Sequence, residues 1–398
     1  MTAADPSAVV VSAAQADADE ERERRTSDLE LFFDLVFVFA ITQVTTLIVS
    51  QPTAAGFARA ALVLALIWWA WSGYAWMTNA IDIESTGVRI AFLLSALGSF
   101  FVALAVPHAY DTQGAWFAVP YIAIRLLHIW LYVRGLRHDP SHQAAIKKLA
   151  PWFLVAPCVA LVGGLVASTD LRTALWALSL TIDVAGALGV GRAGFRVSPA
   201  HFAERYALFV IIALGESIVA IGVGAADDPR DMTFAFTVVI AFAGAAALWW
   251  AYFDFVAIAA ARALRFAPPE KRGPRARDVF TFFHYPQVLG IIFFAVAAKE
   301  TLAGPLEPLP ASGRAALALG GSLPLLATVL GRYRIVRHVA WERVAGIAAI
   351  VAVSASFRDV DAVWSLLAIV AILVTTVTAE MLRLRDARLQ IRADGPPT

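Results

Sequence analysis

Two carboxylates stand in an apolar stretch close to the start of the chain. Residues 30–43 read ELFFDLVFVFAITQ, in which Glu30 and Asp34 are four residues apart and therefore share one face of a helix. An ionised carboxylate near the centre of a bilayer costs about 2.5–3.5 kcal/mol, so such groups usually face a partner or a water-filled cavity. The roles open to Asp34 are therefore proton binding, cation binding and a buried ion pair.

A second stretch in the middle of the chain combines the same residue types. It begins with Glu204 and Arg205 and continues as YALFVIIALGESIVAIG, which carries Glu216. Arg205 and Glu216 are about three helical turns apart and share a face, but this separation is too long for a direct pair within one helix. Glu216 therefore needs a partner on another helix, water, or a proton.

Other polar residues interrupt the apolar runs further along. Arg125 stands midway along one run with His128 on the same side, and Asp183 and Asp254 lie in later runs. Arg125 could neutralise Asp34, Asp183 or Glu216 in a buried pair, which is the structural interpretation of each residue taken singly. The apolar runs hold four acids, Asp34, Glu216, Asp183 and Asp254, but one arginine, Arg125. Because the acids outnumber the arginine, we expect some of them to be protonated or cation-bound. The candidate pathway residues are Asp34, Glu216, Arg125, Asp183, Asp254 and His128.

The composition shows what kind of element must position these groups. Of the 398 residues, 60% are hydrophobic and 16% charged, and the mean hydropathy is +0.70, whereas soluble domains are about 25% charged. The sequence therefore predicts an all-α, polytopic membrane protein with membrane lipids as partners. The net charge of +1 and the scattered arginines indicate no nucleic-acid partner.

Apolar stretches of spanning length number about twelve. They cover residues 31–49, 58–77, 89–106, 115–133, 150–167, 172–190, 206–224, 233–260, 285–301, 315–331, 339–356 and 362–382. With both termini in the cytoplasm, most of the 32 Lys and Arg residues fall on the cytoplasmic side, as the positive-inside rule requires. Residues 1–27 and 386–398 are expected to be cytoplasmic tails, the first of them disordered.

Short motifs recur in the same order in both halves of the chain. Trp68-Trp69-Ala70-Trp71 is echoed by Trp249-Trp250-Ala251-Tyr252, and Ala174-Leu175-Trp176 by Ala362-Val363-Trp364. The order predicts two parallel six-helix repeats, at 28–197 and 198–385. The tryptophans could line a cavity, although helix packing and interface belts are their commoner roles.

The two acid-bearing stretches together resemble the bacterial low temperature requirement protein A family over residues 28–390. The signature residues on these motifs are Glu30, Phe33, Asp34, Glu204, Arg205, Gly215, Glu216 and Ser217. The resemblance implies a multi-pass protein of the bacterial inner membrane, but no settled biochemical activity. A fainter similarity links Phe33-Asp34-Leu35-Val36-Phe37 to potassium channels with two six-helix sets. Phe33 replaces the serine of that pattern, and potassium selectivity is not inferred.

The leading functional hypothesis is a proton-coupled carrier or an ion pathway, with its site between the two repeats near the midplane. Its substrate would be a small ion or small molecule. The alternative is a non-transporting membrane protein, a lipid-interacting or envelope-stress factor whose buried charges only lock helices together. An enzyme is not expected, because the sequence lacks HExxH, nucleophile-elbow and phosphate-loop motifs, and no cofactor or metal site is predicted.

Overall fold

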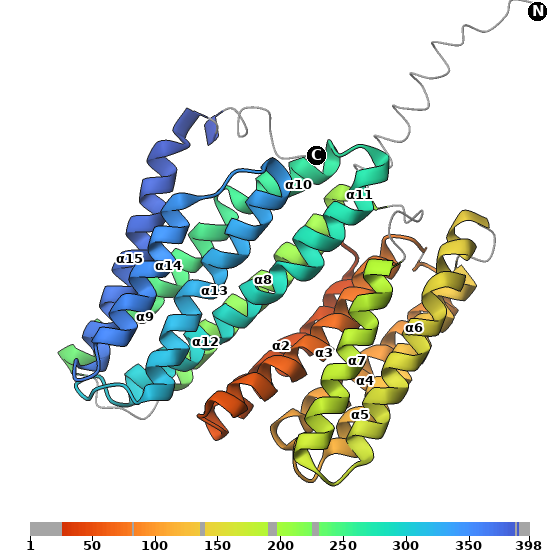
Figure 1. Cartoon of the computed structure of the whole chain (residues 1–398), viewed down its shortest axis with the longest axis horizontal. Helices are drawn as coiled ribbons and strands as arrows, with labels where there is room; N and C mark the ends of the chain where they lie inside the picture. Colours follow the sequence, from red (N-terminus) through yellow and green to blue (C-terminus); the bar gives the residue numbers. More distant parts are fainter. Residues whose placement is uncertain are drawn as a thin grey trace, which may run out of the picture.

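The computed structural model describes residues 26–389 except 82, 136–139, 190–196, 225–230 and 387. Most of the two predicted tails therefore lies outside the described residues. Within the described residues the chain is almost entirely helical, as the composition predicts. Its helices lie roughly along a common direction in two groups placed side by side (Figure 1).

The first group consists of six long helices and one short 3₁₀ turn. They are α2 (Asp28–Ser50), α3 (Ala54–Thr78), α4 (Thr86–Ala105), η1 (Val106–His108), α5 (Gly114–Gly135), α6 (Pro140–Leu165) and α7 (Thr169–Gly189). Helices α4 to α7 pack each against the next, α2 packs on α4, and α3 packs on α2, α5 and α7. The start of α2 is fixed by a capping box in which Ser27 and Glu30 bond each other's backbone N–H.

The second group begins with α8 and ends with α15. Its members are α8 (Pro199–Gly224), α9 (Met232–Phe253), α10 (Val256–Arg265), α11 (Pro269–Ala276), the π-helix η2 (Arg277–Phe282), α12 (His284–Ala303), α13 (Ala311–Val336), α14 (Trp341–Ser356) and α15 (Ala362–Arg383). Helices α12 to α15 again pack in succession, α8 packs on α12, and α9 packs on α8 and α15.

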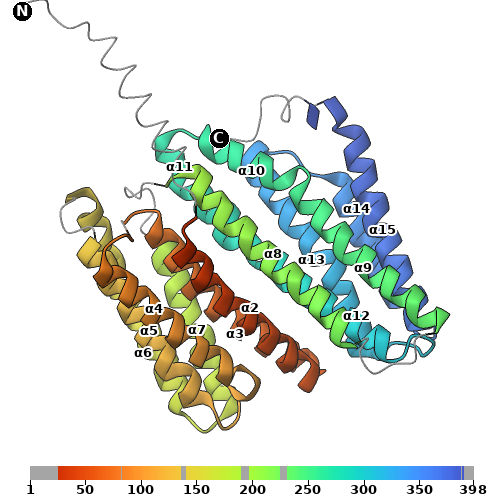
Figure 2. The same cartoon turned by 180° about the vertical axis from the view of Figure 1, so that it is seen from behind.

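The two groups meet along four helices. Helices α2 and α3 of the first group contact α8 and α12 of the second, as both faces of the molecule show (Figures 1 and 2). The joint core is rich in aromatic rings, such as Trp71 against Phe209 with ring centroids 4.3 Å apart. Both informative sequence stretches, which form α2 and α8, therefore lie at the boundary between the groups.

Each of the twelve predicted spans coincides with a helix, but one prediction needs correction. The run 233–260 is a single apolar stretch, Met232–Arg265, but it is not one unbroken helix, because α9 ends at Phe253 and α10 begins at Val256 after a turn at Asp254 and Phe255. Among the described residues, ten helices are long and apolar enough to cross a membrane. The apolar part of α6, Ala150–Leu165, is shorter, and α14 has 16 residues.

Candidate functional site

The Arg205 side chain joins α8 to α2 at the end where both helices begin. Its guanidinium donates to Glu30 Oε1 at 2.5 Å and to Asp34 Oδ1 at 2.7 Å. All three residues are buried, with at most 2% of each exposed. The four-residue spacing of the two acids therefore serves to hold one arginine between them. We call Glu30, Asp34 and Arg205 the Arg205 cluster.

Neighbouring side chains complete the Arg205 cluster. His201, one turn before Arg205, lies 3.2 Å from a Glu30 carboxylate oxygen, and the Trp71 indole N–H donates to Asp34 Oδ1 at 2.8 Å. The Trp71 ring also lies under the guanidinium, 5.8 Å from its central carbon. Asp34 is thus paired with Arg205 and hydrogen-bonded to Trp71, and both partners are protein side chains.

The tryptophans of α3 have packing roles rather than a belt position. Trp68, Trp69 and Trp71 are all buried, and Trp68 donates to the carbonyl of Thr281 in η2 at 2.8 Å. The Thr281 hydroxyl in turn lies 2.9 Å from the Tyr206 hydroxyl of α8. These contacts tie α3, η2 and α8 together beside the Arg205 cluster.

Glu216 lies about three turns further along α8, again at the boundary with α2. Its carboxylate accepts a 2.5 Å hydrogen bond from the Thr42 hydroxyl, and 3% of the residue is exposed. Among the described residues it has no ion-pair partner, although the charge of Lys299 on α12 acts on it from a greater distance. A Cβ built on the adjacent Gly215 would meet no atom within 4 Å, so the side of α8 that Gly215 faces has no close neighbour at this point.

Arg125 and Asp183 form a separate buried pair inside the first group. Arg125 donates to Asp183 Oδ1 at 2.7 Å between α5 and α7, and at most 1% of each side chain is exposed. Arg125 therefore neutralises Asp183 and neither Asp34 nor Glu216. The nearby His128 lies 3.0 Å from the carbonyl of Gly73, a contact between α5 and α3.

The remaining predicted residues lie elsewhere. Asp254 stands at the end of α9 and pairs with Arg388 of the C-terminal segment. Glu204 is exposed and accepts from the Thr26 backbone N–H at 3.1 Å, so it does not match the buried Glu30. Phe33 is buried in the aromatic core against Tyr74, and the Ser217 hydroxyl reaches the Ile291 carbonyl at 3.5 Å. The six candidate pathway residues are thus not gathered in one site.

The sequence interpretation missed one further charged group. Arg343 of α14 donates to Glu380 of α15 at 2.6 Å and to the Thr328 hydroxyl of α13 at 2.5 Å. Arg205 and Arg343 each bring a further buried acid with them, Glu30 and Glu380, so these two arginines do not by themselves reduce the predicted surplus of buried acids. The signal was present in the sequence, because Arg343 and Glu380 both border apolar runs that must pack against each other.

The fold and this site together define a multi-pass helical membrane protein whose two helix groups are joined by an arginine–carboxylate cluster. The chain belongs to the bacterial low temperature requirement A protein family, whose model matches residues 25–378. It is also 31% identical over 331 residues to the uncharacterized protein RA0937 of Rhizobium meliloti (strain 1021), covering 80% of this chain and 79% of that one. No solved structure matches the chain.

The family match explains the spread of the signature residues. Six of them are buried: Glu30, Asp34, Arg205 and Glu216 lie between α2 and α8, whereas Phe33 packs against Tyr74 of α3 and Ser217 reaches Ile291 of α12. In the described part of the chain, no three His, Cys, Asp or Glu side chains are grouped so as to hold a metal ion. The charged signature residues Glu30, Asp34, Arg205 and Glu216 therefore lie at the joint between the groups, with charge pairing at one end and Glu216 at the other.

Proposed function

We propose that the protein is a proton-coupled transporter in which Glu216 binds the proton or cation. The observation that supports this is a buried carboxylate between the two helix groups whose hydrogen-bond partner is a neutral hydroxyl. A buried acid without a paired cation favours the protonated form or a bound cation, and such groups typically mark ion and proton pathways. The substrate would be a small ion or molecule.

The other candidate residues take supporting roles in this proposal. Asp34 and Arg205 hold α2 to α8, so relative movement of the groups would act on the same joint that carries Glu216. Arg125 with Asp183, and Asp254 with Arg388, fix helices within one group. No catalytic step and no cofactor is assigned.

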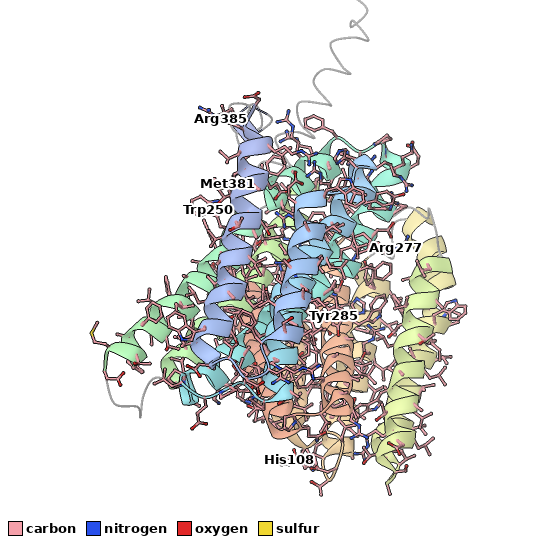
Figure 3. All side chains as sticks on the ribbon, turned by 60° about the vertical axis from the view of Figure 1, so that its left-hand side comes forward. His108, Trp250, Arg277, Tyr285, Met381 and Arg385 are labelled. Atoms are coloured by element: carbon pink, nitrogen blue, oxygen red, sulfur yellow. The ribbon has the colours of Figure 1, made fainter. Side chains whose placement is uncertain are left out.

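Two parallel repeats fit this mechanism. The succession of neighbours in α2–α7 recurs in α8, α9 and α12–α15, which supports the predicted units 28–197 and 198–385. Their side-chain environments differ, since Trp68 and Trp69 are buried whereas Trp249 and Trp250 are each 44% exposed. Figure 3 shows Trp250 on the outer side of α9.

We further infer that both termini lie in the cytoplasm and that the membrane is the bacterial inner membrane. The described ends support this, because Arg385 and His108 lie at opposite ends of the molecule (Figure 3). The arginine-rich elements α10 and α11 lie at the end opposite the loop that carries His108. A basic end of this kind faces the cytoplasm under the positive-inside rule.

A second candidate function is favoured by the number of completed charge pairs. Asp34, Asp183, Asp254 and Glu380 all contact arginines, as expected for a non-transporting membrane protein whose charges lock helices together. The two functions differ in what they predict for Glu216: only a transporter should lose proton flux when this side chain is neutralised.

The test is proton flux into proteoliposomes loaded with a pH-sensitive dye, under an imposed pH gradient and potassium diffusion potential. The wild-type protein should carry protons, and Glu216→Gln should reduce the rate to that of empty liposomes. Glu204→Gln is the matched control, because it makes the same change at an exposed position on the same helix. Wild-type flux in Glu216→Gln, or no flux above empty liposomes in the wild type, would refute the proposal.

A further inference from the structure

A cavity of about 430 Å³ opens where α9 gives way to α10. Its walls come mainly from α10 and α13, with fewer residues from α9, η2, α12, α14 and α15, and they are mostly apolar. Phe266 and Val336 stand at its edge with 70% and 59% of their surfaces exposed, so the cavity reaches the outside of the protein. This volume is typical of pockets that hold a small organic ligand or part of a larger one.

The polar groups of this cavity carry excess positive charge. Arg343 and Arg332 both contact the Glu380 carboxylate, at 2.6 and 3.3 Å, and Arg262 lines the wall with them. Two guanidinium groups thus share one carboxylate at the floor. An anionic group entering from the mouth would meet a positive potential.

Gln287 adds an unsatisfied polar atom to the wall. It is buried, with 2% exposed, and its Oε1 has no hydrogen-bond partner among the described residues. Buried side-chain oxygens in native proteins almost always have a partner. The amide is therefore available to a ligand in the cavity.

A basic pocket of about 400 Å³ adjoins the apolar cavity, and Ile335 lines both. Its charged lining comprises Glu270 and four cations, Lys271, Arg275, Arg334 and Arg337. Arg334 is paired with Asp278 at 2.7 Å, whereas the described residues give Lys271 and Arg337 no carboxylate partner. Both of these side chains are exposed, so a phosphate could reach them.

The sequence and position of α10 are those expected of a helix that lies along a membrane surface. It is a short amphipathic helix that follows the apolar α9 and carries Arg262 and Arg265 in its last turn. Helices of this type lie at the boundary between headgroups and acyl chains. The apolar cavity would then be level with acyl chains, and the basic pocket with phosphates.

We propose that the two adjoining pockets form one binding site for an anionic phospholipid of the cytoplasmic leaflet. The acyl chain occupies the apolar cavity, the phosphate lies between Lys271 and Arg337, and the Gln287 amide bonds an ester oxygen or hydroxyl of the lipid. Basic pockets between membrane helices on the cytoplasmic side are suited to such headgroups. This site is in the second group alone and does not depend on the transport proposal.

Native mass spectrometry of the purified full-length chain in detergent tests this site. We expect the protein to retain one dioleoylphosphatidylglycerol at concentrations where dioleoylphosphatidylcholine is released. Lys271→Gln/Arg337→Gln should weaken retention at least about tenfold, because each cation near a phosphate favours binding. Arg134→Gln/Arg358→Gln is the matched control, since it removes two exposed arginines far from the cavity and should leave retention unchanged.

Two further measurements separate the acyl chain from the phosphate. Ala263→Trp, which fills the cavity wall, should also abolish retention, and dihexanoylphosphatidylglycerol should bind more weakly than the long-chain lipid. Displacement of the lipid by inorganic phosphate would show a free-anion site instead. Equal retention of both dioleoyl lipids, equal loss in the control variant, or no lipid retained by the full-length chain would each overturn the proposal.

Discussion

The helix pair α2 and α8 buries acids at two places with opposite electrostatic environments. At one place Arg205 bonds Glu30 and Asp34, and Trp71 and His201 complete the surroundings. At the other, about three turns away, Glu216 accepts a hydrogen bond from Thr42 and contacts no cation among the described residues. The same two helices thus hold two acids that share a cation and one acid that has none among the described residues.

The difference separates two meanings of a buried acid in a membrane protein. A paired acid fixes helix positions, and its loss leaves an uncompensated cation in the interior. An acid with a neutral donor can gain or lose a proton without leaving a charged partner behind. Burial alone therefore does not distinguish the two kinds of acid, whereas the presence or absence of a paired cation does.

Removal of Arg205 should have the largest effect. Arg205→Leu leaves two buried acids, Glu30 (1% exposed) and Asp34 (2% exposed), without their shared cation. We therefore expect a loss of about 3–5 kcal/mol in the free energy of unfolding. Denaturant unfolding in detergent, followed by tryptophan fluorescence, measures this. Arg358→Leu, at an exposed position, is the control and should change stability by less than about 0.5 kcal/mol.

Neutralising the whole Arg205 cluster sharpens the same prediction. Arg205→Leu combined with Glu30→Gln and Asp34→Asn should recover more than half of the lost stability, because no uncompensated charge then remains. If the triple variant is as unstable as the sum of its single substitutions, the cluster acts through packing and not through charge pairing.

Breaking the Arg125–Asp183 pair should have the next largest effect. Arg125→Leu orphans one carboxylate instead of two, so we expect a loss of about 3 kcal/mol, at the lower end of the range for broken buried pairs. The measurement is again denaturant unfolding, with proton flux recorded in parallel. Arg125→Leu/Asp183→Leu should recover stability, and a double variant no better than the single one would contradict the pairing.

The positions of the helices could be predicted from the sequence, whereas the pairing of the buried acids could not. Helix positions followed from apolar run length, because a bilayer allows few other ways to bury a backbone. The turn at Asp254 lies inside one continuous apolar stretch, Met232–Arg265, so composition alone places α9 and α10 in a single run. One helix per run was therefore predictable, whereas its end at a turn was not.

Charge partners were harder to predict than helices. Arg205 lies just before the predicted span 206–224 and was left out of the balance of buried charges, although Arg205 and Tyr206 are both fully buried. Which arginine meets which acid depends on the packing of α8 on α2, a contact between residues some 170 positions apart. Spacing along one helix carries no information about that contact.

Glu216→Gln and Asp34→Asn make the same chemical change on the two sides of the comparison, and they should give the smallest effects and the clearest contrast. Asp34→Asn removes charge from a site with a fixed cation, so we expect a loss of about 2 kcal/mol, as for hydrogen bonds to charged groups. Glu216→Gln retains an acceptor for the Thr42 hydroxyl and leaves no cation unpaired, so stability should change by less than about 1 kcal/mol. Denaturant unfolding of both variants under one set of conditions gives the difference directly. Equal losses at the two positions would mean that Glu216 is held by a charge as Asp34 is, and the distinction between the two ends of α8 would then disappear.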